Sequence, residues 1–387
     1  MSIAAMIIVI TIILSIVGST NYYVARRLYQ WLSIFITQTN AKIFAALYLF
    51  LTMLMILGFI RSFLPIPSVI KSILNWISSY WMGISLYLFM FILLADVVLL
   101  IGGLIKIIPK PIPQNVLFWK GLIALVLATS IVCYGAINAA FVKHVSYGIQ
   151  LKNVSLGNIK VVILADLHLG SASQIEKNLG KIVQDINDLE PDIVCLIGDI
   201  FNDDYKAIRN PAAAIESFKG IDSKHGVYAC LGNHDGGSTL SQMMHFLEEC
   251  NIILLNDEHV IVDNRFVLIG RLDHRPIGSI GELEKKRRNI TDILASINTD
   301  MPIIVMDHDP LNIKQYGNEV DLILAGHTHR GQVYPGNLIT RAMYIIDYGH
   351  YQKDADSPHV IVTSGASTWG PPLRIGTNNE IVTIILQ

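Results

Sequence analysis

Residues 159–168 read Ile-Lys-Val-Val-Ile-Leu-Ala-Asp-Leu-His. The short apolar run from Ile159 to Ala165 is typical of a buried β-strand. It leads directly into an aspartate and a histidine, Asp166 and His168. Side chains at positions i and i+2 of extended backbone point the same way. The stretch therefore predicts a strand that brings two polar side chains to one point in space.

The same arrangement recurs along the chain. Four more apolar runs end in Asp, Asn or His, namely 192–197 with Gly198-Asp199, 226–231 with Gly232-Asn233-His234-Asp235, 303–306 with Asp307-His308, and 322–325 with Gly326-His327-Thr328-His329. Helical patterns lie between them at 174–189, 241–249 and 283–297, and a hairpin is expected from 260–262 and 266–270. Strands alternating with helices predict a layered α/β domain with its ligand site at the carboxyl ends of the strands.

These endings together predict a metal site. A single ending means little, because Asp, Asn and Gly are common in turns. Oxygen and imidazole ligands without a thiolate suit Mn²⁺, Fe or Zn²⁺. The candidate ligands exceed what one tetrahedral site uses, and they suit two cations about 3.5–4 Å apart that share a carboxylate.

The motif order DxH, GD, GNHD, H and GHxH resembles that of the calcineurin-like metallophosphoesterases. Two further stretches, Thr-Trp-Gly-Pro-Pro-Leu-Arg at 368–374 and Gly-Gln-Val at 331–333, resemble the membrane-associated branch of that family. The resemblance covers about residues 158–387. It implies a four-layer α/β/β/α sandwich, in which two mixed sheets are flanked by helices.

The resemblance also implies a role for each residue. The first metal would be held by Asp166, His168, Asp199 and His329. The second would be held by Asp199, Asn233, His308 and His327, which makes Asp199 the bridge. His234 would be free to contact the phosphate and protonate the leaving oxygen, and Asp235 would orient its imidazole. All these positions are filled, which favours an active enzyme over a non-catalytic sensor or scaffold.

Four other charged residues have two interpretations each. Asp203 and Asp204 could hydrogen-bond a site histidine or cap the following segment. Arg330 and Arg374 could contact a phosphate or serve only as surface charge.

The first part of the chain has a different composition. Up to residue 150 it contains nine Lys and Arg against one acidic residue, Asp96, a formal charge of 9 − 1 = +8. The whole chain has 29 basic and 31 acidic residues, so the remainder carries 20 − 30 = −10. We therefore expect two domains, a transmembrane domain at 1–150 and a catalytic domain at 151–387.

Four apolar stretches are long enough to cross a hydrocarbon core about 30 Å thick. They are 3–24, 43–60, 82–104 and 121–142. A cleaved signal peptide is the alternative for the first, although it lacks a positive leading region. Residues 68–77 predict a short amphipathic helix in the membrane interface, with a disordered loop as the alternative. Asp96 is expected to pack between helices or near the interface, a substrate contact being the alternative.

The basic residues of the short loops predict the orientation. Six of them lie in the first and third loops, and Arg61 and Lys71 lie in the second. Basic loops stay in the cytoplasm. We therefore expect a multi-pass plasma-membrane protein whose two termini and catalytic domain lie outside the cytoplasm.

The combined expectation is a membrane-anchored, two-metal hydrolase of phosphate esters or anhydrides. The membrane half suggests a phosphodiester or pyrophosphate at the bilayer surface, such as a lipid-linked one, with a soluble nucleotide as the alternative. Membrane lipid is the expected partner, and no nucleic-acid partner is expected. A small transporter is the third interpretation, and it depends on Asp96 alone.

Overall fold

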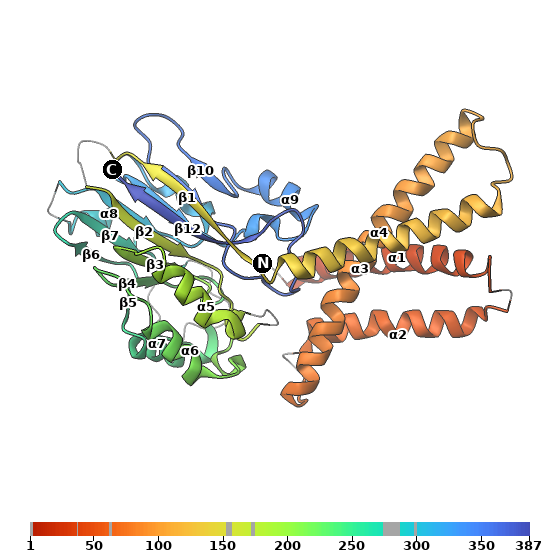
Figure 1. The fold of residues 1–387 in the computed structure, drawn as a ribbon, viewed down its shortest axis with the longest axis horizontal. Helices are drawn as coiled ribbons and strands as arrows, with labels where there is room; N and C mark the ends of the chain where they lie inside the picture. Colours follow the sequence, from red (N-terminus) through yellow and green to blue (C-terminus); the bar gives the residue numbers. More distant parts are fainter. Residues whose placement is uncertain are drawn as a thin grey trace. The chain divides into compact units, whose positions relative to one another are not determined.

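The computed structural model describes residues 3–36, 38–61, 64–151, 157–171, 175–273, 287–297 and 300–387. The chain divides into two compact units, residues 1–135 and 136–387 (Figure 1). The composition of the sequence predicts a boundary after residue 150 instead. The structural division falls earlier because residues 142–149 form a strand that pairs along its whole length with the last strand of the chain.

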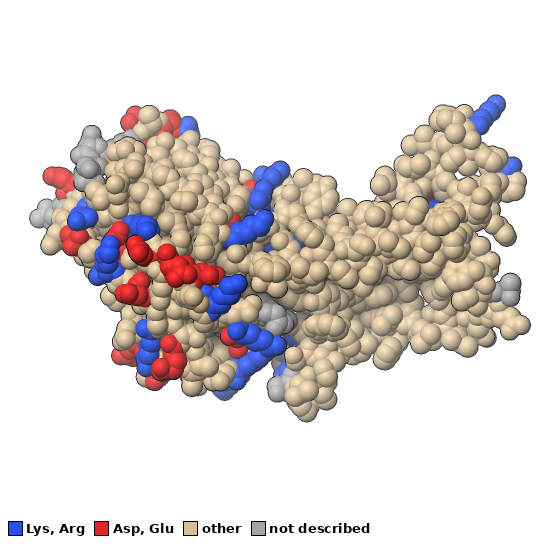
Figure 2. All heavy atoms as spheres, viewed as in Figure 1, with Lys and Arg blue, Asp and Glu red and all other residues tan. Residues whose placement is uncertain are grey.

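The first unit is helical and poor in charge. Its helices are α1 (Ile3–Leu32), α2 (Ala41–Phe59), α3 (Ser68–Leu104) and α4 (Gln114–Asn138), the last of which ends in the second unit. Figure 2 shows charged side chains gathered on the second unit and almost none on the surface of these helices. Among the described residues three helices are long and apolar enough to span a membrane, α2, α3 and α4, with mean hydropathies of 2.1, 2.7 and 2.2. The count of four spans is thus one too high for the described residues; the predicted span at 3–24 is helical as part of α1 but is not one of these three.

The separate interfacial helix predicted at 68–77 is wrong. These residues are the first turns of α3, which continues without a break to Leu104. One of the polar residues that were assigned to water, Asn75, is buried, and one turn further the buried Ser78 donates its hydroxyl to the carbonyl of Met55 on α2 at 2.8 Å. A polar stripe that is satisfied by a neighbouring helix looks the same in sequence as one that is satisfied by solvent.

Asp96 joins three helices of the first unit. Its Oδ2 lies 2.7 Å from Nε of Arg27 on α1 and accepts from the Tyr23 hydroxyl at 2.5 Å. Its Oδ1 lies 2.6 Å from Nζ of Lys120 on α4. Ionisable groups in membrane helices are usually paired in this way, so these contacts support the packing role.

The second unit contains two six-stranded mixed sheets. The first has the order β1 (Val142–Ile149), β12 (Asn379–Leu386), β2 (Ile159–Leu164), β3 (Ile193–Ile197), β4 (Val227–Cys230) and β5 (Ile252–Leu254). The second has the order β10 (Gly349–Tyr351), β11 (His359–Val362), β9 (Leu322–Ala325), β8 (Ile303–Met306), β7 (Phe266–Gly270) and β6 (Glu258–Val262). Strands β2 to β5 are parallel, as are β7, β8, β9 and β11. The carboxyl ends within each parallel set therefore share one edge of their sheet.

Three apolar cores separate the layers. The first lies between the first sheet and α5 (Ile175–Asn187), α6 (Pro211–Lys219) and α7 (Leu240–Glu249). The second is built from the inner faces of both sheets, and the third covers the outer face of the second sheet together with α8 (Ile290–Leu294). Helix α5 shows why these elements form, since Ile175, Leu179, Ile182, Val183 and Ile186 recur at helical spacing and are all buried. The four-layer α/β/β/α prediction is confirmed.

The strand predictions were closest where a buried run is bounded by turn residues. β8 and β9 have the predicted bounds, and the predicted hairpin forms as the antiparallel pair β6–β7. The helix expected at 283–297 is present as α8 alone, and residues 283–286 lie outside the described ones. Strands β1 and β12 and helices α6 and α9 (Gly336–Met343) are present although no pattern of the sequence predicted them.

Candidate metal centre

Four strand ends bring their polar residues together in two groups. Each group offers metal-binding atoms that all lie within 4.8 Å of one another. The first group comes from the ends of β2 and β9, and the second from the ends of β3, β8 and β9. The groups are Asp166, His168 and His329, and Asp199, His308 and His327.

Asp199 lies between the two groups. Its Oδ2 is 3.1 Å from Nε2 of His308 in its own group and 3.8 Å from Nε2 of His168 in the other. The first group is equally tight, because Oδ1 of Asp166 is 3.4 Å from Nε2 of His329. One carboxylate within reach of both groups is what a shared ligand requires, so this position supports the bridging role.

The seventh predicted ligand, Asn233, supplies an independent test of whether a cation fits. Its Oδ1 is buried and has no hydrogen-bond partner among the described residues. A buried acceptor without a donor costs about 1–3 kcal/mol, and an amide oxygen is a common ligand of a hard cation. His308 is also oriented for a cation. Its Nδ1 lies 2.8 Å from the carbonyl oxygen of Ile197, and its buried Nε2 lies 3.1 Å from Oδ2 of Asp199. Such a carbonyl fixes the tautomer that leaves Nε2 free for a metal.

The backbone of the site is not extended. Asp166, His168, Asp199, His327 and His329 all have positive φ, at 57°, 48°, 50°, 70° and 47°. Non-glycine residues in this region are uncommon and cluster at functional sites. The side-by-side projection expected from extended backbone is therefore wrong for the last pair: His327 and His329 belong to different groups.

Two glycines make room for these ligands. A Cβ at Gly232 would lie 2.3 Å from Oδ1 of Asp199, and one at Gly198, where φ is +70°, would lie 2.6 Å from Nδ1 of His308. Both contacts are shorter than side chains tolerate. The GD and GNHD motifs thus contain glycine because the neighbouring strand ends approach so closely.

The family model for the calcineurin-like phosphoesterases matches residues 159–331, which include every one of these ligands. The chain contains a calcineurin-like metallophosphoesterase domain. An uncharacterized metallophosphoesterase of Campylobacter jejuni is 27% identical over 68% of this chain and 69% of its own. One of Helicobacter pylori is 30% identical over 59% and 60%. A bovine transmembrane protein with metallophosphoesterase domain is 28% identical over 68% and 62%, so the chain spans only about three-fifths of the last two relatives.

Together with the three apolar helices, this similarity identifies a membrane protein. The family is one of phosphoester hydrolases, which implies a phosphoester substrate.

His234 lies beside the two groups of the metallophosphoesterase domain, and a different carboxylate from the expected one orients it. Its Nδ1 is 2.7 Å from Oδ1 of Asp203. Asp235 instead accepts backbone N–H groups, from Phe201 at 2.7 Å and Gly232 at 2.8 Å, so the orienting role predicted for it is wrong. Burial lowers the pKa of His234, but Asp203 and Asp199 outweigh it and raise that pKa above its ordinary value.

Both alternatives considered for the aspartate pair are realised, one by each residue. Asp203 binds the site histidine, whereas Oδ1 of Asp204 accepts the N–H of Lys206 and caps a 3₁₀ turn. The sequence signal for Asp203 was only its closeness to the GD motif. Asp235 keeps a structural task, because it ties the loop after β4 to the loop after β3.

Arg330 and Arg374, the two arginines with two interpretations each, have different surroundings in the structure. Arg330 lies over the ring of Tyr348, 4.1 Å from its centroid. Arg374 is fully buried, and its Nη1 donates to the carbonyl of His329 at 2.9 Å while its Nη2 lies 3.2 Å from Nδ1 of the same residue. Arg374 therefore positions a predicted metal ligand, a role that the sequence analysis missed.

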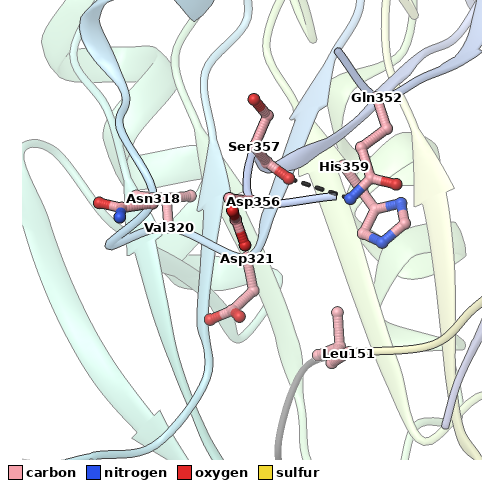
Figure 3. A pocket seen from close by; sticks show the side chains of 8 residues that line it. All are labelled: Leu151, Asn318, Val320, Asp321, Gln352, Asp356, Ser357 and His359. Carbon is pink, nitrogen blue, oxygen red and sulfur yellow. Dashed lines mark hydrogen bonds between the residues drawn. The ribbon is translucent and has the colours of Figure 1, made fainter. Parts of the chain in front are cut away.

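A small pocket elsewhere in the unit is separate from this centre (Figure 3). Its lining includes Asp321 and His359, which stand at the amino ends of the parallel strands β9 and β11. The predicted ligands follow the carboxyl end of β9. Within the pocket, Gln352 donates to the carbonyl of Ser357 at 3.0 Å, so part of its polar lining is already satisfied.

Proposed function

We propose that this membrane protein hydrolyses a phosphodiester or pyrophosphate at the bilayer surface with two divalent cations, Mn, Fe or Zn. The observation that carries the proposal is the pair of ligand groups with Asp199 in one group and 3.8 Å from His168 of the other, beside a histidine outside both groups. A non-catalytic sensor would need the ligands but not the paired His234 and Asp203.

Each residue has a defined task in the proposal. Bound cations would neutralise the phosphate oxygens and make a water nucleophilic at neutral pH. Asp203 accepts the Nδ1 proton of His234, which holds the ring still. The other ring nitrogen is then available to give a proton to the leaving oxygen, opposite the attacking water. The backbone N–H of His234 donates to Oδ1 of Asp199 at 2.8 Å, and this bond fixes the distance between the proton donor and the shared carboxylate.

The proposal is tested on the full chain in detergent micelles, with bis-p-nitrophenyl phosphate and added Mn²⁺. We expect His234→Ala to lower the rate about 10²–10⁴-fold, the usual size of general-acid catalysis, and Asp199→Asn to abolish metal-dependent turnover. His245→Ala is the matched control, because that side chain is 67% exposed on α7. Equal rates in all of these proteins would end the proposal, and stoichiometric metal without turnover of any phosphoester would favour the sensor.

We infer further that the catalytic unit lies outside the cytoplasm of the plasma membrane, on the basis of the basic first and third loops. His245→Cys in a Cys133→Ser background provides a single exposed thiol, since the other described cysteines are buried. Labelling of intact cells by a membrane-impermeant maleimide is expected. Protection in intact cells that disappears on lysis would reverse the orientation.

A further inference from the structure

Helix α9 turns its apolar side away from the protein. None of its eight residues is buried, and Leu338, Ile339 and Met343 are 53%, 61% and 59% exposed. Its polar side faces inward instead: the Thr340 hydroxyl donates to Oδ2 of the buried Asp347 at 2.7 Å. A surface helix of a globular domain has the reverse arrangement, so α9 is built to meet an apolar environment.

Further exposed apolar side chains extend this surface. Trp369 belongs to the same region because Gln332 binds both its N–H and its carbonyl, each at 2.8 Å. We call the α9 patch the set of Tyr334, Leu338, Ile339, Met343, Ile345 and Trp369. Single exposed apolar residues are normal, whereas a cluster of this kind marks an interaction site.

The α9 patch is tied to the point where the chain leaves its last candidate span. The final turn of α4 belongs to the second unit, and there Nδ2 of Asn138 donates to the carbonyls of Arg374 and Thr377, at 3.0 and 2.8 Å. Between those two residues, the carbonyl of Ile375 accepts the N–H of Tyr334 at 2.9 Å. The segment that begins the patch is thus two hydrogen-bonded contacts away from the end of a helix of membrane-spanning length.

The composition of the α9 patch fits a lipid surface. Tryptophan and tyrosine flank aliphatic side chains, as in the aromatic belts of membrane proteins. The exposed Arg341 on the same helix, and Lys143 just after α4, supply the positive charge that anionic lipid headgroups attract. A protein partner would need no such combination.

We propose that the α9 patch inserts into the bilayer and holds the metal centre at the membrane surface, where it acts on phosphoesters of lipid headgroups. This inference rests on the proposed function for its substrate, and on the patch alone for its docking. The rings of Trp369 and His234 lie 5.9 Å apart. The inserted surface therefore reaches the proton donor, and a headgroup beside Trp369 is within range of the site.

Docking is tested without turnover. The full chain in a Cys133→Ser background carries an environment-sensitive fluorophore at Ile339→Cys, in phosphatidylcholine vesicles with phosphatidylglycerol and nitroxide-labelled lipid. The matched control carries it at Ile261→Cys on β6, which is 47% exposed outside the patch. We expect strong quenching at 339 and little at 261. Equal quenching at both positions, or none at 339, would overturn the docking, and the latter result would point to a protein partner.

The substrate half is tested with Leu338→Ser combined with Ile339→Ser, against Ile261→Ser. We expect the KM for a vesicle-embedded phospholipid phosphoester to rise about tenfold, which corresponds to about 1.4 kcal/mol. Turnover of soluble bis-p-nitrophenyl phosphate is expected to stay unchanged. Equal loss on both substrates would refute a lipid-docking role, because it would indicate general damage. Quenching at 339 in a chain that turns over neither substrate would sustain the docking and reject the proposed function.

Discussion

Replacement of Arg374 by methionine is the most informative perturbation of the metal centre. The side chain is fully buried, and four oxygen atoms are among the acceptors of its guanidinium. They are the carbonyls of His329, Ser364 and Ser367 and Oδ1 of Asn379. Methionine has a similar length but no donor, so Arg374→Met removes this donor from all four oxygens, and only the His329 carbonyl keeps a backbone donor, the N–H of Gln332 at 2.9 Å.

The expected cost follows from those bonds. Each hydrogen bond to a charged group contributes about 1.5–3 kcal/mol, and such values do not add. Removal of one member of a buried charged network costs about 3–5 kcal/mol in all. For a domain of this size each kcal/mol lowers Tm by about 2–4 °C, so we expect a Tm about 6–20 °C lower. His329 also loses two of its contacts, and the affinity for the metal is expected to fall about 10–100-fold.

The assay is thermal unfolding of the full chain in detergent, followed by metal titration at a temperature where both proteins are folded. Arg209→Met is the matched control, because that side chain is exposed; its Tm should change by less than the equivalent of about 0.5 kcal/mol. Arg374→Lys should recover little, since an ammonium cannot reproduce the planar fork. An Arg374→Met protein with unchanged Tm and metal affinity would refute the positioning role.

Three further changes test other parts of the site and the fold. Asp203→Asn should lower turnover about 10–100-fold through the orientation of His234, with the metal content measured by atomic absorption unchanged; lost metal would mean that Asp203 acts otherwise. Gly232→Ala places a methyl group 2.3 Å from Oδ1 of Asp199, so metal binding should fail by the same measurement, whereas Gly180→Ala, which has open space, should bind normally. Asp192→Asn should lower the free energy of unfolding by about 1 kcal/mol at pH 7. Burial raises the pKa of Asp192, but the Lys224 ammonium and the N–H of Lys160 lower that pKa more. A carboxyl with a depressed pKa stabilises the fold above its unfolded pKa near 4 and loses this effect as pH falls through the folded value, so the Tm difference should vanish near pH 3, and a constant difference would contradict the linkage.

The local pattern of the sequence determined most of the strands of the second unit and its candidate metal ligands. Buried runs such as 303–306 and 322–325 carry their own boundaries, because each is continuous and ends in turn residues. The polar residues after them are candidate ligands whatever the exact register, since the carboxyl ends of parallel strands share one edge of a sheet. Composition likewise distinguished the membrane helices from the second unit, because the length and hydropathy of a helix are properties of a single segment.

Only the tertiary structure decided which residues face each other. His327 and His329 are two positions apart yet belong to different groups, because positive φ at both residues turns their side chains apart. Asp203 rather than Asp235 reaches His234, and Arg374 reaches His329 across 45 residues of chain. The outward side of α9 could not be read from its sequence either, since helical spacing is the same whether the apolar side meets a core or a bilayer. These are contacts between distant segments, and the amino-acid pattern of one segment does not encode the position of another.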